Sequence, residues 1–271
     1  MKVIICKNAK KKDDPNCEKV NAVRDKLREL GYEAEYSEEA HGDCDFIVTV
    51  GGDGTILSHG KTAARLGKPL LGINTGRLGF ITSVEFDELD KLKLLKEKKW
   101  RTCSRMMLDV EINGQKFSAL NDAVFSREPG AKLPDFEVSS NGITISQFRA
   151  DGLILSTPTG STAYALSAGG PIIEPWMDCM ELTPLCAHSL FGRPMILSAE
   201  SPVIVKLTAA AINEADDGHA VYVSVDGDAE IRLKKGESAV ISKSALRLAL
   251  IELDGGGFYC AVRNKLMKPL K

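Results

Sequence analysis

The 271-residue sequence contains no apolar run long enough to span a membrane. Its first residues, Met1 to Cys6, predict a short strand and not a signal peptide. An excess of charge of either sign is also missing, because 35 basic residues stand against 37 acidic ones and give a net charge of −2. Proteins that bind nucleic acids are usually more basic. We therefore expect neither a nucleic acid nor a membrane as a partner.

Close pairs of cysteines and clusters of histidines are absent as well. The seven cysteines are scattered without a Cys-x-x-Cys pair, and the four histidines are equally dispersed. This pattern predicts reduced thiols in a cytoplasmic protein and argues against a structural zinc site. An apolar content of 44% and a charged content of 27% are typical of a globular protein.

The first hundred residues alternate strand patterns with helix patterns. Continuous apolar runs predict buried parallel strands, whereas apolar residues three or four positions apart predict helices. We expect strands at 3–6, 32–36, 46–50 and 69–73, and helices at 15–30, at 56–66 and around Leu89 to Leu95. Repeated strand–helix units predict a Rossmann-like parallel sheet with ligands at the carboxyl ends of its strands.

From about residue 101 the pattern changes to alternating apolar and polar residues. Asn113-Gly114 and Asn141-Gly142 each join two such segments and predict β-hairpins. Further strands are expected at 203–207, 221–225, 231–233 and 246–251, and a helix only around 161–168. We therefore predict an α/β domain at 1–100, a mostly antiparallel β-rich domain at 101–253 with a cleft beside the first, and a tail at 254–271 that could return to the first domain.

The stretch Gly51-Gly52-Asp53-Gly54-Thr55 lies between the predicted strand at 46–50 and the next helix. Glycines let a ligand approach the backbone, and N–H groups at the start of a helix attract anions such as phosphate. Asp53 would repel a phosphate, unless it contacts a hydroxyl that becomes phosphorylated or a metal ion that accompanies the phosphate. A tight turn in which Asp53 only caps the helix is the alternative.

A second stretch, Asp151 to Pro171, leads from an apolar strand into a turn rich in hydroxyl groups. Such a turn offers hydroxyls and amides to a polar ligand, and Tyr164 adds an aromatic face. The alternative is a turn in which Ser161 or Thr162 only caps a helix.

Taken together, these stretches resemble the NAD kinases. The resemblance covers about residues 45 to 230 and is most specific in Ser156 to Pro171, whereas lipid kinases and phosphofructokinases share the glycine turn. The family order is matched by Gly51–Thr55, Asn74–Phe80, Asn121-Asp122, Asp151–Pro171, Ala187–Leu190 with Arg193-Pro194, and Val225–Gly227. It implies an α/β domain followed by a β-rich domain, and a homodimer or homotetramer.

The resemblance also implies an activity and a set of site residues. The activity is phosphoryl transfer from ATP or polyphosphate to the adenosine-ribose 2′-hydroxyl of NAD, with Mg²⁺ or another divalent cation. Asp53 matches the proton acceptor of the family, and Gly54 matches the adjoining turn. The other positions implied to bind the dinucleotide are Asn121, Asp122, Lys132, Arg149, Asp151, Thr162, Ala163, Tyr164, Ala165, Leu166 and Ser167.

Several roles stay open on the sequence alone. Asp53 could accept a proton or ligate the metal. Asn121 and Asp151 could be ordinary turn residues, His188 could serve packing only, and Arg77 could lie on the surface or hold donor phosphates. Asp228 stands where some members carry Gln, which puts a contact at that position in doubt.

Three other classes of protein compete with this reading. A lipid kinase of the diacylglycerol or sphingosine type usually continues its glycine motif into Asn-Glu-Val-x-Asn-Gly, and this chain does not. A non-catalytic nucleotide-binding domain would not need Asp53. A dehydrogenase would carry Gly-x-Gly-x-x-Gly after the first strand, where this chain has Cys6-Lys7-Asn8-Ala9.

Overall fold

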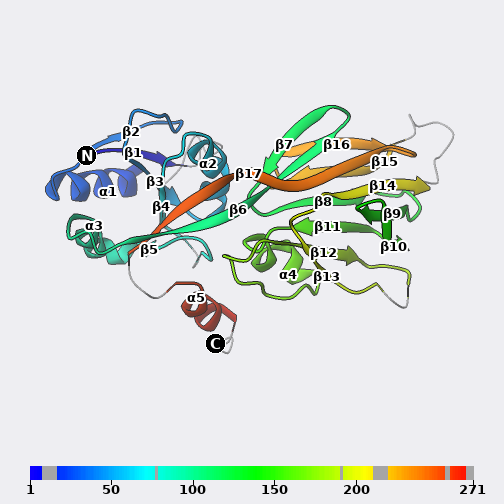
Figure 1. The fold of residues 1–271 in the computed structure, drawn as a ribbon. Helices are drawn as coiled ribbons and strands as arrows, with labels where there is room; N and C mark the ends of the chain where they lie inside the picture. Colours follow the sequence, from blue (N-terminus) through cyan, green and yellow to red (C-terminus); the bar gives the residue numbers. More distant parts are fainter. Residues whose placement is uncertain (8–16, 77–78, 190–191, 210–218, 254–256, 267–271) are drawn as a thin grey trace. The chain divides into compact units, whose positions relative to one another are not determined.

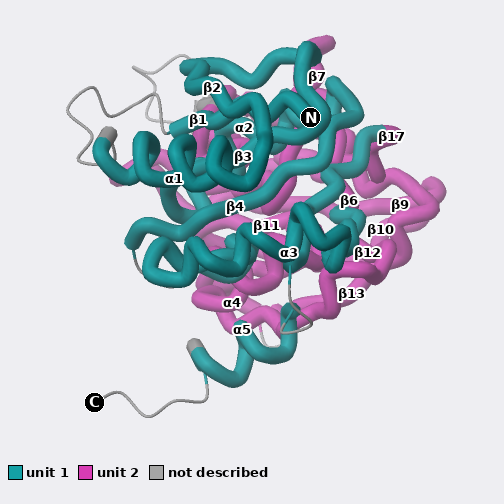
Figure 2. The backbone as a smooth tube through the Cα atoms, turned by 90° about the vertical axis from the view of Figure 1, so that its left-hand side faces the viewer, with its two compact units in different colours: residues 1–105, 246–271 teal, residues 106–245 magenta. Residues whose placement is uncertain are grey.

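The computed structural model describes residues 1–7, 17–76, 79–189, 192–209, 219–253 and 257–266 (Figure 1). The chain forms two compact units, coloured separately in Figure 2. Unit 1 comprises Met1–Arg105 and Leu246–Lys271, and unit 2 comprises Met106–Ala245. Both boundaries differ from the ranges expected from the sequence, because two long strands, β6 (Arg101–Ile112) and β17 (Ser238–Glu252), continue across them.

Unit 1 contains a parallel sheet with the strand order β2-β1-β3-β4. Beyond β4, the sheet continues with β5 and with the last part of β17, where Leu250 pairs with Leu70 in parallel. The elements of this unit, besides the shared strands, are β1 (Lys2–Lys7), α1 (Cys17–Glu29), β2 (Glu33–Tyr36), β3 (Phe46–Gly51), α2 (Asp53–Arg65), β4 (Leu70–Asn74), β5 (Val84–Glu85), the 3-10 helix η1 (Phe86–Leu92), α3 (Lys93–Lys96) and α5 (Gly257–Leu266).

Helices cover both faces of this sheet. Successive strand residues point to opposite faces, so neighbouring residues of one strand contact different helices. Leu71 and Ile73 of β4 lie in the same buried cluster as Val23 of α1. Gly72 between them faces α2, where a Cβ atom would overlap the side chain of Ile56. The continuous apolar runs in the sequence thus correspond to strands buried on both sides, and the predicted Rossmann-like sheet is confirmed.

The predicted helix around Leu89 to Leu95 is wrong in form. The structure has the 3-10 helix η1 followed by the four-residue α3, and Glu88 inside η1 departs from helical angles (φ −112°, ψ 25°). Leu92 and Leu95 are nevertheless buried. Leucines at helical spacing therefore marked a buried face without specifying a continuous α-helix.

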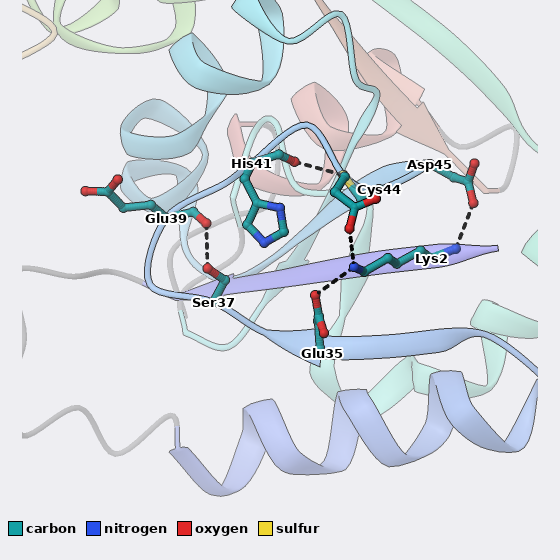
Figure 3. A network of polar contacts seen from close by, with 8 residues as sticks. Lys2, Glu35, Ser37, Glu39, His41, Cys44 and Asp45 are labelled. Carbon is teal, nitrogen blue, oxygen red and sulfur yellow. Dashed lines mark hydrogen bonds and ion pairs between the residues drawn. The ribbon is translucent and has the colours of Figure 1, made fainter.

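The loop between β2 and β3 carries a network of polar contacts, some of them to the start of β1, which Figure 3 shows in close-up. The backbone N–H of Lys2 donates to Asp45 at 2.7 Å, and its ammonium group pairs with Asp43 and Glu35. Most of these side chains are solvent-exposed, so each ion pair contributes little to stability. The network fixes the loop before β3, at the edge of the sheet opposite to the glycine turn.

Unit 2 is built from antiparallel strands in two sheets. One sheet has six strands in the order β13-β12-β11-β8-β15-β16, and the other joins β10, β9 and β14 to β17, which also pairs with the β6–β7 hairpin. The strands not yet given bounds are β7 (Gln115–Ala119), β8 (Asp122–Arg127), β9 (Asp135–Ser140), β10 (Ile143–Arg149), β11 (Gly152–Ser156), β12 (Cys179–Leu185), β13 (Met195–Ser198), β14 (Val203–Ala209), β15 (His219–Val225) and β16 (Ala229–Lys234).

The two sheets share one apolar core. Phe125 of β8 and Phe136 of β9 meet edge to face with ring centroids 6.5 Å apart, and both are fully buried. Both predicted hairpins are confirmed, as β6–β7 and β9–β10. Asn113 and Asn141 have φ of 51° and the following glycines φ of 74°, the left-handed angles that a two-residue hairpin turn requires.

Candidate active site

The glycine turn closes β3 and begins α2. Gly51 ends the strand, Gly52 precedes the helix, and Asp53 is the first helical residue. A Cβ atom at Gly51 would overlap the hydroxyl of Thr55, so the local fold requires glycine there. At Gly52 and Gly54 an added Cβ would meet nothing within 4 Å. The backbone at these two positions is thus open to an approaching ligand.

The carboxylate of Asp53 is held by a loop that lies far along the chain. The N–H of Phe80 donates to Oδ2 at 2.7 Å, and the N–H of Ile81 donates to Oδ1 at 3.2 Å. A Cβ at Gly79 would overlap Oδ1, which explains the glycine at that position. Each carboxylate oxygen has a second lone pair. The orientation of Asp53 is therefore fixed while acceptor positions remain for a substrate hydroxyl.

The same loop is anchored by Asn74 at the end of β4. This residue is 1% exposed, and its amide nitrogen donates to Glu85 at 2.7 Å. Its oxygen accepts from the N–H of Gly76 at 3.3 Å. Asn74 therefore shapes the backbone that leads to Phe80. Arg77 and Leu78 lie outside the described residues, so the open role of Arg77 stays a prediction.

In unit 2, three sequence motifs meet at one end of the six-stranded sheet. Asp122 begins β8, and it pairs with Ser156 at the end of β11. Val225 ends β15 beside Ala123 on the other side of β8. Neighbouring strands are antiparallel, so the start of β8 must lie beside the ends of β11 and β15. The segments around Asn121 and Asp226, 105 residues apart in the sequence, are brought together in this way.

Asp226 binds this junction through three backbone N–H groups. Its Oδ2 accepts from Leu120 at 2.8 Å, and its Oδ1 accepts from Asn121 at 2.8 Å and Asp122 at 3.1 Å. Asp226 itself has a φ of 51°. A carboxylate that accepts several backbone N–H bonds fixes a loop firmly. The sequence places Asp226 in a motif shared with the NAD kinases, but no local pattern reveals this contact.

The side chain of Asn121 is half-buried, and its amide has no hydrogen-bond partner within the part of the chain that the structure describes. Its backbone, in contrast, is fully engaged. The carbonyl accepts from the N–H of Thr157 at 2.8 Å, and the N–H donates to Asp226. A rigid backbone that presents a free amide suits recognition of a ligand. Asp122 beside it is 6% exposed.

The hydroxyl-rich turn after β11 is largely occupied with its own structure. Thr157 donates to the carbonyl of Leu120 at 2.6 Å, and Ser161 donates to Pro158 at 2.7 Å and accepts from the N–H of Ile173 at 3.0 Å. Both residues are buried. Gly160 is required because a Cβ would overlap the carbonyl of Asn121. These hydroxyls therefore build the turn and attach it to Asn121.

The continuous helix expected at 161–168 is absent. The 3-10 helix η2 (Gly160–Thr162) and the short α4 (Tyr164–Ser167) are separated by Ala163, which has φ −103° and ψ −124°. The hydroxyl of Thr162 donates to the Thr159 carbonyl at 3.1 Å. Tyr164 is 49% exposed and Ser167 is exposed, whereas Ala165 is buried and Ala163 and Leu166 are half-buried. Tyr164 is thus accessible to a ligand, as the sequence suggested, and its binding role stays a prediction.

Three charged residues of the predicted site lie on the surface of unit 2. The guanidinium of Arg149 forms two hydrogen bonds to Asp135, at 2.7 and 2.8 Å, and this pairing lowers the pKa of the Asp135 carboxyl. Asp151 forms an ion pair with Arg127. Lys132 is exposed between β8 and β9. The structure does not bring Lys132, Arg149 and Asp151 to the Asn121 junction by any direct contact among the described residues.

A further buried carboxylate lies beneath the hydroxyl-rich turn. Glu181 of β12 is fully buried and accepts hydrogen bonds from Thr183 at 2.6 Å and from Ser156 at 3.3 Å. Burial raises the pKa of the Glu181 carboxyl. Gly170 faces it so closely that a Cβ would overlap its oxygen. Glu181 therefore supports the turn from inside the unit.

Two features of the described residues bear on metal ions and membranes as partners. Among the described residues, no group of three or more His, Cys, Asp or Glu side chains could hold a metal ion. Mg²⁺ commonly uses one or two carboxylates together with substrate phosphates, and Asp53 with its spare lone pairs fits that mode. No helix in the described part of the chain is long and apolar enough to cross a membrane.

Two family models and several relatives of known name match most of this chain. Residues 2–95 match the model of the ATP-NAD kinase N-terminal domain, and residues 120–253 match that of the ATP-NAD kinase C-terminal domain. The NAD kinase of Alcanivorax borkumensis is 38% identical over 246 residues, which cover 89% of this chain and 80% of that protein. The NAD kinase of Symbiobacterium thermophilum is 38% identical over 84% of this chain and 80% of that protein.

Two solved structures share the fold. Yeast NADH kinase complexed with NADH superposes with a TM-score of 0.85 at 23% identity, covering 100% of this chain and 88% of that one. An NAD kinase from Archaeoglobus fulgidus in complex with ATP has a TM-score of 0.74 at 26% identity, with 98% of each chain covered. The matched segments contain both the glycine turn with Asp53 and the Asn121 junction held by Asp226. This chain therefore belongs to the NAD kinase family.

Proposed function

We propose that this protein transfers the terminal phosphoryl group of ATP to the adenosine-ribose 2′-hydroxyl of NAD. The bond between the γ-phosphorus and the β-phosphate oxygen breaks, a bond to the ribose oxygen forms, and the products are NADP and ADP. The observation that carries this proposal is Asp53: an oriented carboxylate with spare acceptor positions beside the open backbone of Gly52 and Gly54. Membership of the family supplies the substrates.

Each unit contributes a different part of the chemistry. In unit 1, Asp53 accepts the proton of the ribose hydroxyl, which is a poor nucleophile until the proton leaves. The open N–H groups of the glycine turn stabilise charge on the donor phosphates. In unit 2, the free amide of Asn121 recognises the adenosine end of NAD, with Asp122 beside it and the exposed ring of Tyr164 on the following turn. To bind the dinucleotide, Arg149 and Asp151 would need to exchange their present partners, Asp135 and Arg127, whereas Lys132 is exposed.

A divalent cation would accompany the donor phosphates. Asp53 would face this ion, because its carboxylate lies beside the glycine turn that is proposed to hold the phosphates. Such an ion offsets the negative charge of the phosphates. A lipid kinase is not favoured, because both domain models of the NAD kinase family match. From the family resemblance we also propose a cytoplasmic homo-oligomer. Size-exclusion chromatography with light scattering would test the assembly.

The direct test is a matrix of substrates with the purified protein and magnesium. NAD or NADH is combined with ATP or polyphosphate, and formation of NADP or NADPH is measured. We expect turnover with ATP and NAD. If no combination yields a phosphorylated dinucleotide while calorimetry shows NAD binding, the non-catalytic nucleotide-binding alternative replaces this proposal.

A further inference from the structure

Unit 1 contains a cavity of about 370 Å³ that none of the sequence motifs predicted. It lies between the loop Gly79–Ser83 and helix α5, and Arg105 of β6 and the end of β17 complete its wall. This volume is within the usual range for sites that bind small molecules. All the residues that line it belong to unit 1.

Two buried polar groups in the cavity wall lack partners. Arg105 is 5% exposed, and its Nε–H has no hydrogen-bond partner within the described parts of the chain. The hydroxyl of Thr82 is also buried and unpaired there. The guanidinium of Arg105 is 3.7 Å from Glu252, too far for a hydrogen bond. Buried donors without acceptors are costly and rare, and both atoms are covered by the wall itself, so an occupant meets them only when the side chain of Arg105 or Thr82 rotates.

The charges of the wall limit what that occupant can be. Three carboxylates, Glu85, Glu88 and Glu252, stand against two cations, Lys91 and Arg105. Lys91 is already paired with Glu88 at 2.8 Å. Arg101, which does not line the cavity, pairs with Glu252 at 2.9 Å. Lys91 and Arg105 both face carboxylates of the wall, so neither is available to hold a chain of phosphates. Hydroxyl groups such as those of ribose are suited to this acidic wall, because they donate hydrogen bonds to carboxylates.

The rest of the wall is apolar and partly aromatic. Phe80 and Phe258 are half-buried, and Leu250 and Leu253 are buried. Aromatic faces bind the flat rings of nucleobases by stacking. An aromatic wall for the base and carboxylates for the ribose hydroxyls together match a nucleoside.

We propose that this cavity binds the nucleoside of the phosphoryl donor, an inference that rests on the proposed kinase activity. The cavity wall is directly connected to the reacting group, because Phe80 and Ile81 line it and donate their N–H groups to Asp53. A nucleoside held here directs its phosphates out of the acidic cavity and along this loop. The donor is therefore a nucleoside triphosphate, and polyphosphate, which has no nucleoside, gains nothing from the cavity.

The test is a variant that fills the cavity from α5. Ala261→Phe places a ring where the nucleoside would lie, and Arg263→Phe is the matched control on the same helix, since Arg263 is exposed and does not line the cavity. Apparent KM values are measured separately for ATP and for NAD. Binding of ADP to the whole protein is measured by calorimetry without NAD.

We expect Ala261→Phe to raise the KM for ATP and weaken ADP binding roughly tenfold or more, the loss of one stacked base. The KM for NAD should stay within twofold, and any turnover with tripolyphosphate should not change. The control should match the parent in all measurements. An unchanged KM for ATP in folded Ala261→Phe, or equal changes for ATP and NAD, would overturn the inference.

The readouts separate this inference from the proposed function. If the parent forms no NADP but Ala261→Phe still weakens ADP binding by that factor, the cavity is a nucleoside site in a protein with another activity. If Ala261→Phe does not fold, Phe258→Leu removes the aromatic face while keeping apolar volume. The same selective rise in the KM for ATP is then required, and its absence contradicts the proposal.

Discussion

Asp53 in unit 1 and Asp226 in unit 2 both bind backbone N–H groups of a distant loop, yet their surroundings differ. Asp226 accepts three such bonds, two of them on one oxygen. Asp53 accepts two, one on each oxygen, beside glycines whose backbone is open. Accepting hydrogen bonds from a loop therefore does not by itself make a carboxylate reactive. Asp53 differs by its unused lone pairs and by its accessible neighbours.

The largest expected effect comes from Asp53→Asn. The amide cannot accept a proton at neutral pH, so kcat should fall on the order of 10²–10⁴-fold, while NAD affinity stays within a few-fold. An amide has one acceptor oxygen in place of two, so one loop bond is weakened and stability should fall by about 1 kcal/mol. Steady-state kinetics and calorimetry measure these quantities.

Asp45→Asn is the matched control for this variant, because Asp45 also accepts a backbone N–H, that of Lys2 at 2.7 Å, in the network of Figure 3. It should keep full activity. Partial recovery of Asp53→Asn in excess magnesium would assign metal ligation to Asp53, and no recovery would assign proton acceptance. Near-parental turnover would remove Asp53 from the mechanism.

Changes at Asp226 should affect substrate binding and stability together. Asp226→Ala leaves three backbone N–H groups without this acceptor, so we expect the free energy of unfolding to drop by about 1–3 kcal/mol or more. The Asn121 backbone then loses its fixed position, and the KM for NAD should rise roughly tenfold, as for one lost polar contact. Denaturant titration and kinetics measure both effects.

Asp226→Asn provides a graded comparison, because its single oxygen can retain part of the bonding. Its KM for NAD and its stability should lie between those of the parent and of Asp226→Ala. If Asp226→Ala keeps the parental KM for NAD, the position of Asn121 does not depend on Asp226.

Gly54→Ala should separate stability from activity in the glycine turn. Alanine in a helix is favoured over glycine by roughly 0.5–1 kcal/mol, so the variant should be slightly more stable. Its methyl group occupies the open side of the turn, so the KM for ATP should rise several-fold. Ser58→Ala on the exposed face of the same helix is the control, with no expected change in kinetics. Unchanged kinetics in Gly54→Ala would mean that no ligand approaches this backbone.

The smallest expected effect is on how the stability of the protein depends on pH, and it comes from Glu181. Burial raises the pKa of this carboxyl in the folded state above its ordinary value of 4.5. The folded protein therefore holds the proton more tightly than the unfolded chain, and this contribution to stability is lost as pH rises through the folded pKa. Glu181→Gln should not lose stability over that interval. Denaturant unfolding between pH 4.5 and pH 8 gives the free energy of unfolding against pH for the parent and for Glu181→Gln. Parallel curves for the two proteins would contradict a raised pKa of Glu181.

The sequence predicted those features that depend on neighbouring residues. Asn113-Gly114 and Asn141-Gly142 specify their hairpins locally, and the run Phe46–Val50 can be buried only inside a sheet covered on both faces. The helix expected at Leu89–Leu95 failed because the same leucine spacing suits a 3-10 turn followed by a short α-helix. Local patterns do not decide between these forms.

The contacts that organise the candidate site could not be predicted in this way. Asp53 is 27 residues from Phe80, and Asp226 is 106 residues from Leu120, so only the folded chain brings them together. Arg105 lies in a strand whose pattern gives no sign that its guanidinium is buried. The partner of each of these carboxylates is a backbone N–H group, which almost every residue has. No residue type in the sequence therefore marks the partner.

The route of the chain through the two units has a consequence for synthesis. Residues 106–245 are continuous, whereas unit 1 needs residues 246–271, and with them the end of β17 and helix α5. On the ribosome, unit 2 is complete while the first 105 residues still lack their last strand partner and one wall of the 370 Å³ cavity. Unit 1 must therefore finish folding after nearly all of this sequence has been translated, and a ribosome that stops near residue 245 releases a chain whose second unit is whole and whose first is not.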